Sequence, residues 1–303
     1  MSEFAVTFWG VRGGRPVSGP GTVEIGGNTT CIEIRAGPHL IVVDAGTGII
    51  GLGAKLAQER ACSGKPIVGT MLFTHGHHDH TQGLAFFAPI RFSDSVFDIF
   101  GPRVFGEDLD QVLKRAMLPS QYPIALDKLP GIRCTRNVRA SEMISLGEPG
   151  AVPAITDAER RGTPSIPGAT LITAHHSSNH PRDGSFCYRV EHQGKSLVVA
   201  TDTEGYEGGD RRLAQFAHGT DLLIHDSEYT DSQYAGPQFA HQGWGHSTWR
   251  MAVEVGRLAG VKRLALTHHH GRHDDVFLRG VEQEAQAEFP GAFLAYEGLT
   301  VDL

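Results

Sequence analysis

The sequence predicts an α/β protein in which two packed, mixed β-sheets are flanked by helices, an αββα sandwich. Short apolar runs rich in Val, Ile, Leu and Phe recur between Gly, Pro, Asn and Asp residues, a pattern typical of strands. Fewer segments carry apolar residues at spacings of three and four, which is typical of amphipathic helices. A strand-rich chain interrupted by such helices suits two sheets with helices on their outer faces.

The chain has 303 residues, of which 40% are hydrophobic. A chain of this size can bury one large core, so we expect a single domain over residues 1–303. Ser247 is the expected cap of the fourth of the predicted helices, and the Gly- and Pro-rich stretch at about 147–168 predicts a long surface loop. Strands are predicted at 4–9, 31–35, 40–44, 67–74, 96–101, 170–174, 186–191, 196–201, 222–226, 263–267 and 293–296, and helices at 48–60, 108–117, 210–217, 248–258 and 276–288.

The formal net charge is -7 at pH 7. Proteins that bind long nucleic acids normally carry clustered Lys and Arg, so this balance argues against such a partner and leaves a small anionic substrate open. No stretch approaches the ~18 apolar residues of a membrane span, and the N-terminal segment does not resemble a signal peptide. The four cysteines lack Cys-x-x-Cys spacing, which favours free thiols. We therefore expect a cytoplasmic protein without membrane association.

The most informative segment is MLFTHGHHDHTQG, residues 71–83. An apolar strand runs directly into His75, His77, Asp79 and His80. A turn that leaves a strand end can point alternate side chains into one cleft, and imidazole and carboxylate groups are ligands that zinc, manganese or iron accept. The His-x-His-x-Asp-His spacing therefore predicts a metal site, because neither strand nor turn geometry requires these residues.

Further ligands are expected where later strands begin or end. Asn179-His180-Pro181 precedes a predicted strand, Asp202 ends the run LVVATD, and His268 ends the run LALTH. Each residue taken alone is more often a turn residue or a satisfied polar group. Two positions stay open at this point, since His175 and His176 lie near His180, and His269 and His270 follow His268.

These segments resemble the metallo-β-lactamase fold superfamily and, within it, the phosphodiesterase branch that includes ribonuclease Z-like and cyclic-nucleotide-hydrolysing enzymes. The similarity runs through nearly the whole chain. It is carried by FWGVRGG, GGNTTCIEI, IVVDAGTGI, FTHGHHDHTQG, NHPRDGSFCYRV, VVATDTE, DLLIHDSEYT, GWGHST and LALTHHH.

The resemblance implies two divalent metal ions, with zinc expected first and manganese or iron as alternatives. It implies that His75, His77 and His180 hold one ion, that Asp79, His80 and His268 hold the other, and that Asp202 bridges them. It also implies that Asp44 braces the metal-binding loop, and that the protein forms a homodimer.

The reaction is indicated by the segment Gly243-Trp244-Gly245-His246-Ser247-Thr248, which resembles the Gly-His-Ser-Thr segment of the phosphodiesterase branch. A hydroxide bridging the two metals is the expected nucleophile. An imidazole at a helix start can hold a phosphoryl oxygen or protonate the leaving alkoxide. We expect His246 in that role, with Asp226 orienting it and Asp79 acting as a catalytic residue as well as a ligand. Arg12 and Asn28 resemble segments that border the cleft and are candidate substrate contacts.

The function expected from these observations is hydrolysis of a small, cyclic nucleotide phosphodiester. The nearest alternative is a ribonuclease Z-like endonuclease acting on precursor tRNA, which the acidic balance disfavours. A thioester or lactone hydrolase would leave His246 without an obvious purpose. A non-catalytic metal-stabilised binding protein is a further alternative, which an intact ligand set disfavours.

Overall fold

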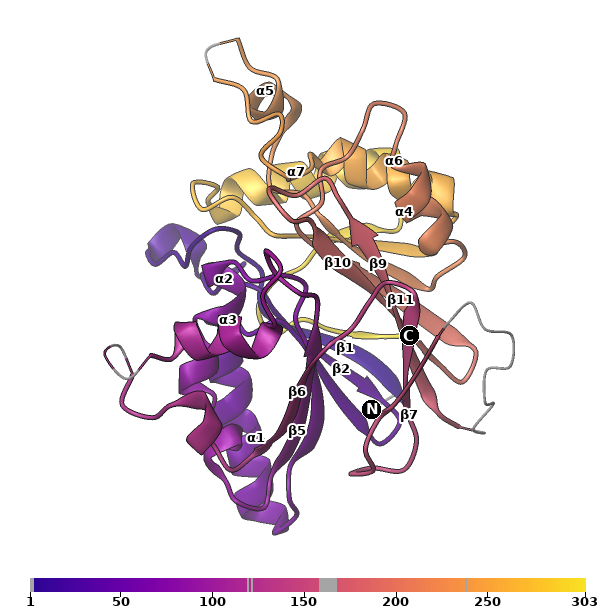
Figure 1. Cartoon of the computed structure of the whole chain (residues 1–303). Coiled ribbons are helices and arrows are strands. Elements are labelled where there is room, and N and C mark those ends of the chain that lie inside the picture. Colours follow the sequence, from indigo (N-terminus) through magenta and orange to yellow (C-terminus); the bar gives the residue numbers. More distant parts are fainter. Residues whose placement is uncertain (1–2, 119, 121, 158–167, 238) are drawn as a thin grey trace.

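The computed structural model describes residues 3–118, 120, 122–157, 168–237 and 239–303. Two β-sheets pack face to face, with helices on both outer faces (Figure 1). The first half of the chain builds most of one sheet, and the second half builds most of the other. The fold class predicted from the sequence is therefore confirmed.

The first sheet has seven strands in the order β15-β1-β2-β3-β4-β5-β6. The strands β3, β4, β5 and β6 run parallel to one another, and the remaining neighbours pair antiparallel. Their bounds are β1 Phe4–Gly10, β2 Cys31–Ala36, β3 His39–Val43, β4 Val68–Leu72, β5 Val96–Gly101, β6 Ile132–Asn137 and β15 Thr300–Asp302.

The second sheet has eight strands in the order β14-β13-β12-β11-β10-β9-β7-β8. The strands β11, β12, β13 and β14 are parallel, and the others pair antiparallel. Their bounds are β7 Glu142–Leu146, β8 Ala154–Asp157, β9 Thr170–Ser177, β10 Ser185–His192, β11 Lys195–Ala200, β12 Leu222–Asp226, β13 Arg263–Thr267 and β14 Ala292–Leu294.

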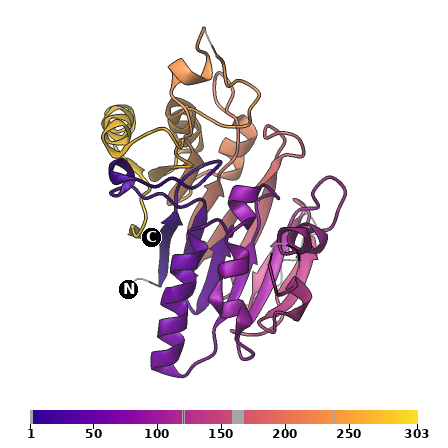
Figure 2. The same cartoon turned by 90° about the vertical axis from the view of Figure 1, so that its left-hand side faces the viewer.

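Helices α1 and α3 cover the outer face of the first sheet, and α4, α6 and α7 cover the outer face of the second (Figures 1 and 2). The helices are α1 Ile49–Ser63, α2 His78–Thr81, α3 Leu109–Ala116, α4 Arg211–Phe216, α5 Asp231–Tyr234, α6 Trp249–Ala259 and α7 Asp275–Glu288, with short 3-10 turns η1 Pro20–Thr22, η2 Leu84–Phe86, η3 Ala88–Arg91 and η4 Leu126–Lys128. None of the described helices is long and apolar enough to cross a membrane.

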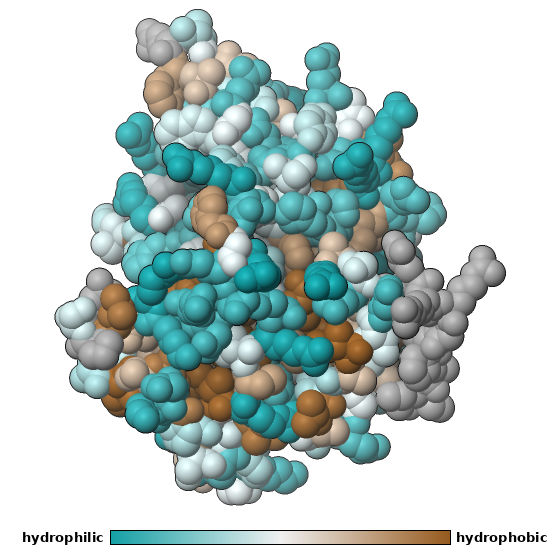
Figure 3. Space-filling model, in the orientation of Figure 1, coloured by the Kyte–Doolittle hydropathy of each residue, from teal (hydrophilic) through white to brown (hydrophobic). Residues whose placement is uncertain are grey.

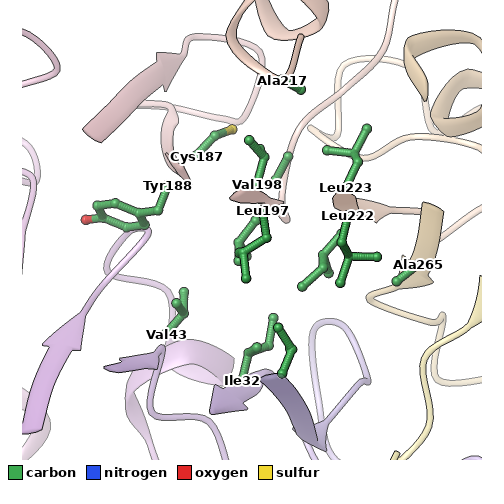
Figure 4. Close-up of a cluster of buried hydrophobic side chains, with 14 of the residues drawn as sticks. Ile32, Val43, Cys187, Tyr188, Leu197, Val198, Ala217, Leu222, Leu223 and Ala265 are labelled. Atoms are coloured by element: carbon green, nitrogen blue, oxygen red, sulfur yellow. The ribbon is translucent and has the colours of Figure 1, made fainter. Parts of the chain in front are cut away.

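The core between the sheets follows from strand alternation. Leu197 and Leu222 point toward Ile32 and Val43 of the first sheet, whereas the adjacent Val198 points toward the helical layer (Figure 4). All five side chains are fully buried. The two faces of β11 and β12 are both apolar because both are covered.

Hydrophilic side chains cover much of the face seen in Figure 3, where apolar side chains gather as separate patches in the lower half.

Several predicted elements need correction. The loop expected at 147–168 contains strand β8, which pairs with β7 at the sheet edge, while residues 158–167 lie outside the described residues. The strands β6, β7 and β15 were not predicted, because polar side chains interrupt them or because they are very short. The cap of α6 is Thr248, whose side chain accepts from Met251 N, and not Ser247.

The two sheets are joined beside the end of β4. The Phe186 N–H donates to the Thr74 carbonyl at 2.8 Å, and the buried Tyr188 hydroxyl donates to the Phe73 carbonyl at 2.7 Å. These bonds bring the start of β10 to the end of β4. The carboxyl ends of β4, β11, β12 and β13 therefore meet at one edge of the sandwich, where ligand sites of parallel sheets form.

Candidate metal centre and active site

One cluster of three imidazoles joins the two sheets. His75 and His77 follow β4, and His180 lies in the turn between β9 and β10. His180 Nε2 lies 3.0 Å from His77 Nδ1, and the rings of His75 and His77 are 4.4 Å apart. His180 Nδ1 donates to the Gly245 carbonyl at 3.1 Å, so its Nε2 offers a lone pair to the cluster. These three nitrogens could hold one ion.

A second cluster lies beside the first. His80 Nε2 is 3.3 Å from Asp79 Oδ2, and His268 Nε2 is 3.6 Å from the same oxygen. His80 Nδ1 donates to Asp44 Oδ2 at 2.8 Å, which leaves His80 Nε2 facing Asp79. Asp44 also accepts from Thr74 N and Thr74 Oγ1, each at 2.8 Å. Asp44 thus braces the metal-binding segment, and Asp79, His80 and His268 could hold a second ion.

Asp202 lies between the two clusters. Its Oδ1 is 3.7 Å from His75 Nε2 and 3.8 Å from His180 Nε2. Its Oδ2 is 3.1 Å from His80 Nε2 and 3.3 Å from His268 Nε2. Burial acts to raise the pKa of Asp202, but the surrounding imidazoles outweigh it and hold that pKa well below its usual value. One oxygen therefore faces each cluster, which is the arrangement of a bridging carboxylate.

The donor set fits a divalent metal. The Nε2 atoms of His75, His80 and His268 and the Oδ2 of Asp202 are buried without a hydrogen-bond partner among the described residues. Buried polar atoms are rarely left unpaired, because each costs free energy comparable to a lost hydrogen bond. Imidazole and carboxylate groups that converge in this way are a donor set suited to divalent metal ions.

Backbone strain is concentrated at this site. Asp44, Asp202 and His268 have φ angles of 62°, 54° and 63°, in the left-handed region that non-glycine residues rarely adopt. Such strain costs free energy and persists where the surrounding structure imposes it. It lets the chain turn sharply at three strand ends, so that each side chain points into the centre.

His246 is held at the edge of the centre. Its Nδ1 donates to Asp226 Oδ2 at 2.8 Å and lies 3.3 Å from Glu228 Oε2, and its ring stacks on His268 at 4.9 Å. Burial lowers the pKa of His246, but Asp226 and Glu228 outweigh this and raise it to about 9. The carboxylates hold the ring beside His180 and Asp202.

The neighbouring histidines point elsewhere. His175 stacks on Phe216, and His176 Nε2 donates to the Asp183 carbonyl at 2.9 Å. The buried His269 donates from Nε2 to the Ala295 carbonyl at 2.9 Å, and the His270 ring lies 5.7 Å from the Tyr229 ring. Among the described residues, the metal-ligand groups contain His180 and His268 and none of these four.

The expected substrate contact of Arg12 is wrong, whereas that of Asn28 stays a prediction. Arg12 is fully buried, and its guanidinium donates to the carbonyls of Gly26 and His273, each at 2.7 Å. Asn28 donates from its amide to Glu297 at 2.9 Å. Both side chains therefore tie the N-terminal loop to the C-terminal part of the chain. The segment reaches the site through the two glycines that follow Arg12.

Gly13 and Gly14 touch the centre. Gly14 N donates to Asp79 Oδ2 at 2.8 Å. A Cβ atom added at Gly13 would lie 2.4 Å from His268 Nδ1, so only glycine fits beside that ring.

Two acids of the site were not predicted at all. Glu228 approaches His246 and His268, and Glu204 binds the backbone before His246. Their position two residues after Asp226 and Asp202 was the available signal.

The fold and this site define a metal-dependent hydrolase of the metallo-β-lactamase fold. Residues 39–269 match the family described as Beta-lactamase superfamily domain, and the chain belongs to that family. The ribonuclease Z of Synechococcus sp. (strain CC9311) is 27% identical over 331 residues, covering 98% of each chain. The class predicted from the sequence, a metal-dependent phosphodiester hydrolase, is confirmed at this level.

Solved structures share the fold. The metallo-β-lactamase fold protein YhfI from Bacillus subtilis superposes with a TM-score of 0.67 at 19% identity, covering 99% of both chains. The short form of human tRNase Z superposes with a TM-score of 0.58 at 21% identity, covering 98% of both chains.

Proposed function

We propose that this protein hydrolyses a small nucleotide phosphodiester, such as a cyclic nucleotide, at a dinuclear metal centre. The observation that carries the proposal is the contact of His246 with Asp226 beside the metal-ligand clusters. An alkoxide leaving group needs a proton donor, whereas a thiolate leaves without one. This contact therefore favours phosphodiester over thioester hydrolysis.

In this proposal, His75, His77 and His180 hold one ion, Asp79, His80 and His268 hold the other, and Asp202 bridges them. The two oxygens of Asp202 face different clusters, which supports the assignment. The bound ions, zinc or alternatively manganese or iron, would supply Lewis acidity and charge neutralisation for a phosphoryl group.

The protein's own proton chemistry runs through His246. Asp226 accepts a hydrogen bond from His246 Nδ1, which fixes the ring. Nε2 is then left to donate a proton to the leaving oxygen. Asp226 is itself held by hydrogen bonds from Asp202 N at 3.1 Å and Ser247 N at 3.0 Å. The acid that orients His246 is thereby positioned relative to the bridging carboxylate.

A cavity beside His75 supports a small substrate. Its volume is about 380 Å³, at the small end of the range for small-molecule sites. Val104, Val138 and Phe186 contribute apolar walls, and Arg139 contributes a cation. A planar base with polar edges suits this lining. The net charge of -7 also supports a small substrate over a long nucleic acid.

A ribonuclease Z-like activity on precursor tRNA is the second candidate. It is favoured by the curated relatives, because the Synechococcus ribonuclease Z aligns along 98% of its own length with this chain. The metal centre and His246 would serve either substrate, so the proposals differ only in what the protein binds around the phosphodiester.

The test is turnover of a substrate panel by metal-quantified protein. The panel holds 2′,3′- and 3′,5′-cyclic mononucleotides, cyclic dinucleotides, a precursor tRNA and an acyl thioester. We expect cleavage of a cyclic phosphodiester, and weaker binding of that substrate when Val104→Trp fills the cavity, with Arg136→Ala on the exposed part of β6 as the control. Cleavage of the tRNA alone would support the second candidate, and cleavage of the thioester alone would contradict both.

A further inference from the structure

Glu204 connects the loop after β11 to the segment before His246. It lies two residues after Asp202, and its half-buried carboxylate accepts hydrogen bonds from Gly243 N at 2.7 Å and Gly245 N at 2.8 Å. The Tyr234 hydroxyl donates to the same carboxylate at 2.6 Å. A charged acceptor makes each of these bonds stronger than a neutral one would be.

The backbone of Gly245 connects Glu204 to His180 and to His246. The Gly245 N–H donates a hydrogen bond to the Glu204 carboxylate, and the Gly245 carbonyl accepts a hydrogen bond from His180 Nδ1. The carbonyl carbon of Gly245 is bonded to His246. Gly245 has a φ of 89°, and a Cβ atom there would lie 2.4 Å from His180 Nδ1, so the backbone packs directly against that ring.

Other hydrogen bonds join the same segments. The Glu204 carbonyl accepts from Asn179 Nδ2 at 2.9 Å, next to His180. The Ser247 hydroxyl donates to the Thr203 carbonyl at 2.6 Å and accepts from Gly205 N at 3.0 Å. The segments 179–180, 202–205 and 243–247 therefore form one hydrogen-bonded unit, and only Glu204 contributes a charge to it among these contacts.

We infer that Glu204 is a positioning residue that fixes both His180 and His246 through the backbone of Gly245. This inference rests on the proposed function for the role of His246, although its effect on His180 does not. The segment that carries α5 projects from the body of the molecule (Figure 1), so the contacts at its base determine where Gly245 lies. Without the carboxylate, two backbone N–H groups lose their acceptor, and Gly245 is free to shift.

The test compares Glu204→Ala with Glu204→Gln and with Glu207→Ala, a matched control that removes an exposed carboxylate from the same loop. The Gln side chain keeps one oxygen that can accept a hydrogen bond. Its NH₂ group would face the other backbone N–H, from which it cannot accept one. Zinc affinity, by chelator competition, reports on His180. The ratio of kcat for a cyclic nucleotide to kcat for bis(p-nitrophenyl) phosphate reports on His246, because p-nitrophenolate leaves without a proton donor.

We expect Glu204→Ala to weaken zinc binding roughly tenfold. This is the lower end of the loss in affinity that is typical when a residue hydrogen-bonded to a metal ligand is replaced. We expect the kcat ratio to fall about tenfold, since displacement of a proton donor by 1 Å is costly. Glu204→Gln should lie between Glu204→Ala and the wild type, and Glu207→Ala should match the wild type. A folded Glu204→Ala protein with unchanged zinc affinity and an unchanged ratio would overturn the inference.

Failure of the proposed function is a separate outcome. If the wild-type protein hydrolyses no phosphodiester, the zinc measurement alone decides the role of Glu204. Weaker zinc binding by Glu204→Ala than by Glu207→Ala then supports the contact through Gly245 to His180, and equal binding overturns it.

Discussion

The two halves of the metal centre are built in different ways. The first half, His75, His77, Asp79 and His80, comes from one short segment that leaves β4 and enters α2. The second half, His180, Asp202 and His268, comes from three separate segments of the other sheet: the turn between β9 and β10 and the segments that follow β11 and β13. The local half is braced by one residue, Asp44, whereas the assembled half depends on packing between the sheets. Strained backbone serves both halves, at Asp44 in the first and at Asp202 and His268 in the second. This comparison predicts how each part fails.

The largest effect is expected at Asp202, the residue of the assembled half that lies between the two clusters. Asp202→Ala should remove bound metal and activity together, because each of its oxygens faces a different cluster. Metal content by mass spectrometry and phosphodiesterase turnover are the measurements, with the exposed Asp231→Ala as the control. Full metal content in Asp202→Ala would exclude the bridging role.

Within the local half, His77→Ala removes a single nitrogen of the three-imidazole cluster. We expect loss of activity with metal content reduced toward one ion per chain, since Asp79, His80 and His268 remain in place. The same metal analysis applies. Retention of two ions and the wild-type rate would show that His77 is not a ligand.

His246→Ala should separate chemistry from metal binding. The variant should keep its metal and lose kcat on a cyclic nucleotide by roughly 10²-fold, the usual contribution of a positioned acid. The loss on bis(p-nitrophenyl) phosphate should be much smaller. An equal loss on both substrates would mean that His246 acts in some way other than as a proton donor.

Gly13→Ala tests the assembled half alone. The added methyl group would lie 2.4 Å from His268 Nδ1, so it displaces that ring and spares His75 and His77. We expect roughly tenfold weaker binding of one ion, as for other changes beside a ligand. Gly280→Ala, at a helical position with open space around it, is the control. Identical metal titrations for both variants would contradict the packing argument.

The smallest effect on activity is expected from Glu33, which lies away from the site on β2. Burial acts to raise the pKa of Glu33, but Arg35, Trp9 and Lys55 outweigh it and hold the pKa below its usual value of 4.5. Its stabilising contribution is therefore present above that value and is lost as pH falls through the lower pKa of the folded state.

Glu33→Gln should accordingly lower the free energy of unfolding by about 1 kcal/mol at pH 7 and by less in acid, with turnover unchanged. Urea unfolding at neutral pH and near pH 3 measures both values. A stability difference that does not shrink in acid would show that the charge of Glu33 is not what matters.

Strands with continuous apolar runs, such as β11 and β12, were predicted because burial on both faces leaves a strong pattern. The strands β6 and β8 were missed because they are half-exposed and carry polar residues. Arg12 was predicted to contact substrate, yet it is buried against backbone carbonyls, because a motif locates a segment without fixing which of its residues faces the cleft.

The sequence by itself determined the fold class and the contiguous part of the metal site, because strand patterns and the spacing His-x-His-x-Asp-His are local properties of the chain. Only the tertiary structure showed that His180 rather than His175 or His176, and His268 rather than His269, lies beside the other candidate ligands, since ring direction depends on strand pairing and on backbone angles at the strand ends. It alone brought Glu228 to His246, and Glu204 to the backbone just before His246, because these contacts join separate segments of the chain.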